Sequence, residues 1–311
     1  MPSDLPPHEP QPYPQPRPGH ARAAAAPRPQ TPPRLTDRNA LRRQRNRAQR
    51  QALFLHETAA DEIDERLAEV NRTFTETAVV TGQPGFWRAR FPRAHVVADD
   101  EVLDLERGRH DLVIHAMALH WADDPVGQLV QARRALRPDG LFLGVCPGGR
   151  TLAGLRTALA EAEAAVTGGL SPRVLPMADL RDMAGLLQRA GLAMPVADSA
   201  LLSVSYADAL ALMRDLRAMG EGNALAARHR RIPPRRLFAE TAARYAAANG
   251  DGTGRVVARF ELIWLAGWAP ADNQPQPLRP GSATARLADA LGTVESPLPE
   301  RAGPAGRPPK D

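Results

Sequence analysis

The sequence predicts an α/β fold in which helices cover a mostly parallel sheet. Strand-like and helix-like segments alternate between residues 77 and 146, and such alternation is typical of a parallel sheet. The segment GLFLGVC, residues 140–146, is apolar throughout, which indicates a strand buried on both faces. A long alternating segment, residues 255–268, is expected to close the edge of the sheet as an antiparallel strand.

The first half of the chain supplies most of the expected strands. Residues 53–70 carry apolar side chains at near helical spacing, which predicts a helix. Three strands follow, at residues 78–82, 95–99 and 111–116. A short helix is expected within FWRARF, residues 86–91, and a longer one over residues 126–136, which Pro138 should stop.

The second half of the chain is more helical. Helices are expected at residues 151–166, 179–191, 208–220 and 237–249, and a strand at residues 200–206. The first of these helices places Leu152, Leu155 and Leu159 on one apolar stripe. Gly191 and Gly220 stand where two of the helices should end, because glycine readily adopts the conformation that closes a helix.

The two ends of the chain differ from its middle in composition. Many of the 31 prolines lie in residues 1–35 or after residue 270. These ends offer little apolar surface to offset the entropy lost on ordering, so residues 1–35 and most of residues 271–311 are expected to be disordered. Residues 36–270 are then expected to form one α/β domain, since 43% of the chain is hydrophobic.

Charge and cysteine content limit the possible classes of protein. The net charge of +5 is almost entirely arginine, because Lys310 is the only lysine. Cys146 is the only cysteine, so no intramolecular disulfide can form and a cytoplasmic setting is expected. No apolar run approaches the roughly 20 residues needed to span a bilayer, which predicts no membrane span.

A dense basic segment, RNALRRQRNRAQR, covers residues 38–50. On a helix, Arg38, Arg42 and Arg45 would share one face. This face could hold an acidic partner, RNA or an anionic membrane surface, or it could be a solvated helix face. Nucleic acid is disfavoured because no aromatic residues for base stacking are interleaved with the arginines.

The stretch TAVVTGQPGF, residues 77–86, has the layout of a nucleotide-binding turn. A short apolar strand ends at Thr81, and Gly82 and Gly85 follow before a helix-like run. Glycines after a strand let the backbone approach a ligand without a Cβ in the way.

Six segments in order carry a resemblance to a known family. They are LTDRNALRRQRNRA, ALHWADDPVGQL, PGGRTLAGLR, GGLSPRVLPM, LMRDLRAMGEGNAL and RPGSATARLADALG. Together they resemble the class I S-adenosylmethionine-dependent methyltransferases. The match is to the branch that holds the malonyl-carrier methyltransferases of biotin synthesis and the bacterial relatives of mitochondrial complex I assembly factor 5. The resemblance covers about residues 35–291.

The resemblance implies a Rossmann-like class I methyltransferase sheet with helical additions. Within residues 36–270, it assigns residues 36–76 to N-terminal helices, 77–146 to the Rossmann half, and 147–270 to helices and closing strands. Such a fold does not by itself settle the reaction, because some relatives are associated with arginine hydroxylation.

The resemblance also implies S-adenosylmethionine as cofactor and suggests where it would lie. The residues at the matching positions are Thr81, Gly82, Gly85, Asp99, Asp100, His115, Ala116, Met117 and His120. Asp99 matches the acid that accepts a hydrogen bond from the adenine amine. No catalytic residue can be assigned.

The cofactor motif departs from the family pattern in two ways. The family strand ends in an acid and a Gly-x-Gly-x-Gly turn, whereas this chain has Thr81-Gly82-Gln83-Pro84-Gly85. Only residues 82–94 separate the first two strands, which is room for one crossover helix and not for the family's second strand and its ribose-binding acid. Residues 95–99 should therefore pair directly beside residues 79–81 or lie across a gap from them.

Other chemistry is disfavoured by spacing. His110, His115 and His120 recur every five residues across a strand and a turn, which does not put them on one face, so no metal site is predicted. Packing under the helix at residue 126 is the alternative for His120, and a solvated loop is the alternative for Asp99 and Asp100. Cys146 ends a buried strand and is expected to be an inert core thiol.

Two functions from different classes follow. The first is a methyltransferase-family enzyme with a degraded cofactor motif, acting on a protein or a carrier. The second is a non-catalytic assembly or binding factor of the respiratory complex I type that keeps the fold and its partner surface. Both imply a protein partner or substrate, and neither fixes the oligomeric state.

Overall fold

The computed structural model describes residues 34–272, 274 and 292. The first half contains α1 (Arg38–Arg45), η1 (Arg50–Ala52), α2 (Phe54–Glu69), β1 (Thr77–Thr81), α3 (Pro84–Arg90), β2 (His95–Ala98), β3 (His110–Ala116), η2 (Leu119–Trp121), α4 (Pro125–Ala135) and β4 (Leu136–Pro147). The second half contains α5 (Ala153–Thr167), α6 (Leu180–Arg189), β5 (Ala193–Tyr206), α7 (Ala209–Ala218), α8 (Arg235–Asn249) and β6 (Val256–Trp268).

The six strands form one mixed sheet in the order β2-β1-β3-β4-β6-β5. The first four are parallel, as the alternation of elements predicted. β2 pairs directly with β1, and Thr81 lies opposite Ala98. The short connection holds only α3, so the prediction that the sheet lacks the family's second strand is confirmed.

The position of β6 differs from the expectation. It lies between β4 and β5, antiparallel to both, so the edge of the sheet is β5. Every residue from Phe260 to Leu265 is buried, because β6 has neighbours on both sides and helices over both faces. β5 alternates between exposed and half-buried residues, as an edge strand with one solvated face does.

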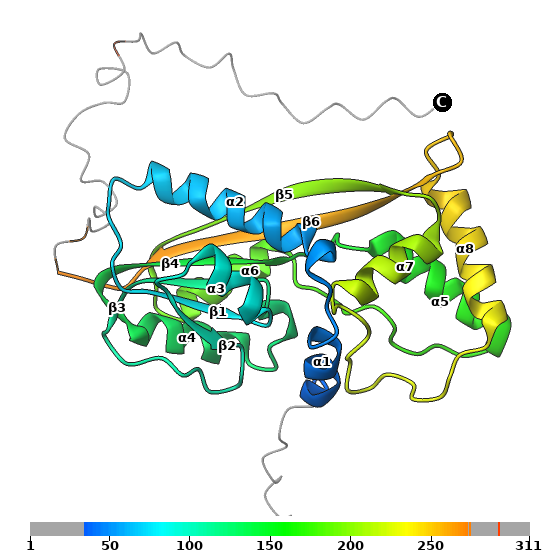
Figure 1. Ribbon diagram of the computed structural model, residues 1–311, viewed down its shortest axis with the longest axis horizontal. Coiled ribbons are helices and arrows are strands. Elements are labelled where there is room, and N and C mark those ends of the chain that lie inside the picture. The colour runs from blue at the N-terminus through cyan, green and yellow to red at the C-terminus, as the bar shows by residue number, and fades with distance from the viewer. Residues whose placement is uncertain (1–33, 273, 275–291, 293–311) are drawn as a thin grey trace, which may run out of the picture. The chain divides into compact units, whose positions relative to one another are not determined.

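Helices cover the two faces of the sheet (Figure 1). On one face, α2 and α3 bury Ile63 and Trp87 against Val79 of β1. On the other face, α4 and α6 bury Leu129 and Leu187 against the strand residues whose side chains point to that side of the sheet. The long strands β5 and β6 extend beyond the parallel strands, and α5, α7 and α8 gather at their far end (Figure 1).

The boundary between α4 and β4 lies earlier than predicted. The helix ends at Ala135, and β4 begins at Leu136 rather than at residue 140. Asp139 takes a left-handed conformation, with φ of 61°, inside an irregular stretch of the pairing between β3 and β4. From Leu141 to Pro147 every residue is buried, which confirms the prediction of a strand covered on both faces.

Two predictions concern regions that the structure describes only in part. The expected disorder of residues 1–35 and 271–311 falls almost entirely outside the described residues. Among the helices that are described, none is both long and apolar enough to cross a membrane.

Candidate functional site

The site lies at the carboxyl edge of the parallel strands. Thr81 of β1 is in register with Ala98 of β2 on one side and with Ala116 of β3 on the other. The residues that follow these three strands therefore leave the sheet side by side, which is where ligands of open α/β sheets bind. Asp99 is the residue after β2. Met117 is the residue after β3, and its φ is positive, at 52°.

Asp99 is buried and bound by two arginines of α1. Its two carboxylate oxygens each lie 2.9 Å from Nη1 of Arg45, and Oδ2 lies 3.3 Å from Nη1 of Arg38. Burial alone would raise the pKa of Asp99, but the charges of Arg45 and Arg38 outweigh it and lower this pKa to about 2. Asp99 is therefore ionised and fully engaged within the chain.

Arg45 lies over the glycine turn that follows β1. The residue is 7% exposed, and an added Cβ on Gly82 would overlap its guanidinium, with Nε only 2.5 Å away. Glycine at this position thus makes room for the arginine side chain. The Nε and Nη2 atoms of Arg45 have no hydrogen-bond partner among the described residues.

A second carboxylate, Glu221, faces Arg45 from the segment after α7. Its Oε1 lies 4.0 Å from Nε of Arg45, and its Oε2 accepts a hydrogen bond of 2.7 Å from the indole of Trp121. Nε2 of His120 lies 3.4 Å from the same oxygen. Burial acts to raise the pKa of Glu221, but these three partners lower it to about 2.

His115 is linked to Asp99 through the buried side chain of Gln128. Its Nε2 lies 2.7 Å from Oε1 of Gln128, whose Nε2 donates to the backbone oxygens of Asp99 and Asp100 at 3.2 and 3.0 Å. Burial lowers the pKa of His115, so the ring is neutral near pH 7. Gln128 thus connects β3 to the loop after β2.

One face of the basic segment is paired with acids of the chain itself. Arg38 and Arg45 bind Asp99, and Nη2 of Arg42 binds Asp100 at 2.6 Å. On this face Arg45 is buried and Arg38 half-buried against the acidic end of β2, whereas the Arg42 side chain is still 58% exposed. These ion pairs hold α1 against the loop that follows β2.

The sequence-derived site residues separate into two groups. Those after β1, β2 and β3 meet at the edge just described: Thr81, Gly82, Asp99, Asp100, His115, Ala116, Met117 and His120. Gly85 does not join them, since it lies within α3 and an added Cβ there would meet nothing within 4 Å.

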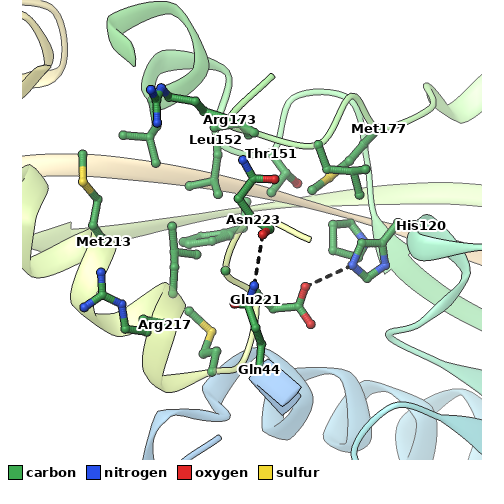
Figure 2. A pocket seen from close by; sticks show the side chains of 18 of the residues that line it. Gln44, His120, Thr151, Leu152, Arg173, Met177, Met213, Arg217, Glu221 and Asn223 are labelled. Carbon is green, nitrogen blue, oxygen red and sulfur yellow. Dashed lines mark hydrogen bonds and ion pairs between the residues drawn. The ribbon is translucent and has the colours of Figure 1, made fainter. Parts of the chain in front are cut away.

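An apolar cavity of about 320 Å³ lies beside this cluster. Figure 2 shows Glu221 and His120 facing each other on one side of it, and Met213 and Arg217 on another. Leucine side chains of α5 form much of its wall, and Arg173 lies at its border, held to Glu163 by an ion pair of 2.6 Å. The cavity is thus largely apolar, with charged side chains at several points of its border.

The remaining titratable candidates lie elsewhere. His110 begins β3, at the end of the parallel strands opposite to the site. Its ring stacks on that of His95, with centroids 6.0 Å apart. Burial raises the pKa of Cys146 to about 12, which keeps it a thiol. Within the described part of the chain, no group of three or more His, Cys, Asp and Glu side chains could hold a metal ion.

Comparison with known proteins identifies the family of this region. Residues 56–144, from α2 to β4, match the family model described as a methyltransferase domain. This part of the chain is thus similar to methyltransferase domains. The resemblance seen in the sequence is thereby confirmed.

Two groups of relatives match this chain. The mitochondrial arginine-hydroxylase NDUFAF5 of Danio rerio is 37% identical over 66% of this chain and 64% of its own, and that of Homo sapiens is 34% identical over 67% and 60%. The malonyl-[acyl-carrier protein] O-methyltransferase of Laribacter hongkongensis is 37% identical over 59% of each chain. The chain therefore spans less than two thirds of the length of these relatives.

The solved structures are more distant. A SAM-dependent methyltransferase from Thermotoga maritima is 10% identical, covers 74% of this chain and 99% of its own, and has a TM-score of 0.41. The strand order, rather than this similarity, identifies the sheet as Rossmann-like.

The methyltransferase-family fold implies S-adenosylmethionine, but the residues present do not fit it. The Arg45 guanidinium lies over Gly82, in the turn where the resemblance places the cofactor. Asp99, the acid expected to accept from adenine, already binds two arginines. Within the described residues 82–94, the strand that would carry the ribose acid is missing.

Sequence reasoning misses the two residues that define this site. It places Arg45 on a helix face without a partner, and it includes Glu221 only as one letter of a family segment. A signal for Arg45 does exist, because three arginines on one face and two adjacent acids after a strand are complementary charges.

Proposed function

We propose that this protein is a non-catalytic binding or assembly factor of the methyltransferase fold, which takes a protein partner and does not use S-adenosylmethionine. One observation carries the proposal: the Arg45 side chain lies over Gly82 and binds Asp99, in the space where the family holds its cofactor. A buried ion pair between Arg45 and Asp99 thus stands where the resemblance places the cofactor.

The charge of Arg45 supports this reading. S-adenosylmethionine carries a positively charged sulfonium, and like charges in a buried site repel each other. Moving Arg45 aside would break its ion pair with Asp99 and leave this buried carboxylate with only the longer contact to Arg38, at 3.3 Å, among the described residues. Breaking a buried ion pair typically costs up to about 3–5 kcal/mol. Cofactor binding would have to exceed that cost before any net affinity appeared.

The cavity supports a role in partner binding. A hollow of about 320 Å³ lined by leucines is large enough for one side chain of a partner protein, and Glu221 at its border offers a carboxylate to a cationic end. The relatives named arginine-hydroxylases act on an arginine, which would match such a pocket.

The single cysteine supports a cytoplasmic setting.

A second function, methyl transfer to a protein or carrier, is favoured by two observations. The cavity lies beside the carboxyl edge of the parallel strands. A relative named malonyl-[acyl-carrier protein] O-methyltransferase is 37% identical over 59% of this chain. This reading requires Arg45 to leave its place when the cofactor enters.

Calorimetric titration of the full chain with S-adenosylmethionine separates the two functions. Two charge-assisted hydrogen bonds are lost, from the first-strand acid and the ribose acid, and each is worth about 1.5–3 kcal/mol. Their loss corresponds to roughly two to four orders of magnitude in affinity. We therefore expect no saturable heat up to millimolar cofactor.

An Asp99→Ala variant is the control for this titration. Micromolar binding to the wild type that Asp99→Ala weakens would show that Asp99 accepts from adenine after all, and the enzyme would be the better assignment. Circular dichroism of both proteins checks that they are folded.

A further inference from the structure

A basic hollow lies on the side of α1 that faces away from Asp99. It has a volume of about 510 Å³ and is lined by five arginines from three segments. Arg43 belongs to the last turn of α1 and Arg47 to the turn after it, Arg214 and Arg217 belong to α7, and Arg228 follows in the chain. Of the residues that the structure describes, no Asp or Glu lines this hollow.

Only one of these arginines is neutralised within the described part of the chain. Arg228 donates from Nη2 to Asp37 at 2.8 Å. For Arg43, Arg47, Arg214 and Arg217, no Asp or Glu oxygen of the described residues lies within 4.0 Å. Four arginines without counter-charge from that part of the chain therefore line one hollow, and Arg217 also borders the apolar cavity.

The arrangement keeps like charges close together. Arg214 and Arg217 are three residues apart on α7, which puts them on the same face of the helix. The chain brings this pair against the end of α1, where Gln49 donates its backbone N–H to Ala218 at 2.7 Å. Like-charged neighbours at this spacing destabilise a helix unless an anion lies between them.

Helix dipoles do not balance these charges. Both α1 and α7 end at the hollow, and the carbonyl end of a helix carries about −0.5 of an elementary charge. Two such ends supply about −1 against four positive charges. A net charge of about +3 remains to be neutralised by a ligand or by solvent ions.

The shape of the hollow distinguishes among anions. Its volume is within the range of pockets for small ligands, roughly 300–1,000 Å³, rather than that of an extended groove. The described residues give it no aromatic side chain on which a base could stack, which disfavours single-stranded nucleic acid. Guanidinium groups bind phosphate oxygens in a bidentate manner, so clustered arginines suit phosphate.

We propose that the basic hollow between α1 and α7 is a binding site for a small multivalent anion, namely a phosphate or pyrophosphate group. The site is separate from the carboxyl edge, since Arg38, Arg42 and Arg45 use the opposite face of α1. It does not depend on the cofactor question.

The test uses inorganic pyrophosphate as the probe, titrated into the full chain at low ionic strength. The variant R47Q/R214Q removes two exposed charges of the hollow. The matched control R181Q/R189Q removes two exposed arginine charges of α6 for which the described residues provide no ion pair. Both variants have the same net charge, so general electrostatics cannot separate them.

Wild type and R181Q/R189Q should bind pyrophosphate with equal affinity, and R47Q/R214Q should bind at least about tenfold more weakly. Pyrophosphate should also raise the melting temperature of the first two proteins and not that of the third. Equal binding by both variants, or no saturable binding by the wild type, would overturn the proposal. A polyglutamate peptide that binds more tightly than pyrophosphate, and whose binding is lost in R47Q/R214Q, would overturn it in favour of an acidic peptide.

Discussion

Arg45 makes contacts with three residues at the carboxyl edge of this sheet. Its guanidinium combines three contacts: an ion pair with Asp99, a weaker approach to Glu221, and direct packing on Gly82. Glycine at 82 has no positive φ to account for it, so the close approach of this side chain is what requires the missing Cβ. Gly82, which the sequence predicts to lie in a nucleotide-binding turn, is thus in contact with an arginine side chain.

Substitution of Gly82 by alanine tests this contact. Gly82→Ala should destabilise the protein by about 1–3 kcal/mol, because the added Cβ overlaps a buried and ion-paired group. In an Arg45→Ala background the same substitution should cost less than about 1 kcal/mol, since the obstacle is gone. Urea unfolding of the four proteins measures both steps.

Gly85→Ala is the control for this double-mutant cycle. An added Cβ there meets nothing within 4 Å and lies in α3, so it should stabilise by about 0.5–1 kcal/mol through helix propensity. An equal cost of Gly82→Ala with and without Arg45 would mean that the two residues are not coupled.

The sequence predicts which strand ends form the site, and it does not predict what occupies it. Asp99, Asp100 and His115 can be found because parallel strands end at one edge. The pairing of Arg45 with Asp99 cannot, because 54 residues separate them and a helical face gives no distance to a distant strand. Patterns within an element do not specify contacts between elements.

At the scale of elements, α1 packs against the carboxyl edge of the parallel strands through its ion pairs with Asp99 and Asp100. Asp37 caps the helix by accepting from the N–H of Ala40 at 3.0 Å, and its second oxygen accepts from Arg228 at 2.8 Å. One side chain therefore fixes the start of α1 and ties it to the segment after α7. The cap positions Arg45, two turns further on, over Gly82.

Two substitutions of Asp37 separate these roles. Asp37→Asn keeps a capping oxygen and loses the ion pair, so it should cost less than about 1 kcal/mol of unfolding free energy. Asp37→Ala loses both and should cost about 1–2 kcal/mol. Chemical denaturation of the two variants checks the order, and an equal loss in both would show that the cap contributes nothing.

The elements themselves are largely predictable from periodicity and length. The short connection of residues 82–94 is sufficient to show that a strand is missing, because a strand and two helices cannot fit there. The predicted place of β6 is wrong, since alternation does not identify a strand's neighbours. The uninterrupted apolar run from Leu262 to Ala266 is the available signal for a central strand.

At the scale of the whole molecule, buried histidines couple folding to pH. Burial lowers the pKa of His56 to about 4 and lowers the pKa values of His110 and His115 from 6.5. His56 is held neutral as the acceptor of the Trp87 indole N–H at 3.0 Å. The unfolded chain therefore binds protons that the folded chain does not, as the pH falls from about 6.5.

Stability should fall between about pH 7.5 and pH 5. The stability from a histidine with a lowered pKa is present above its unfolded value and is lost as pH falls toward the folded value. His56 alone should contribute a loss of roughly 2 kcal/mol at pH 5. Asp99 and Glu221, with pKa values of about 2, stay ionised throughout this range. Urea unfolding at the two pH values measures the change, and His56→Gln should reduce it. Greater stability at the lower pH would contradict the account.

The most direct test of the central claim is a crystal structure of the full chain grown in a large excess of S-adenosylmethionine. The account predicts electron density for the Arg45 guanidinium against Asp99 and over Gly82, with no adenosine at the carboxyl edge. An adenine amine bound to Asp99, with Arg45 displaced from Gly82, would contradict it.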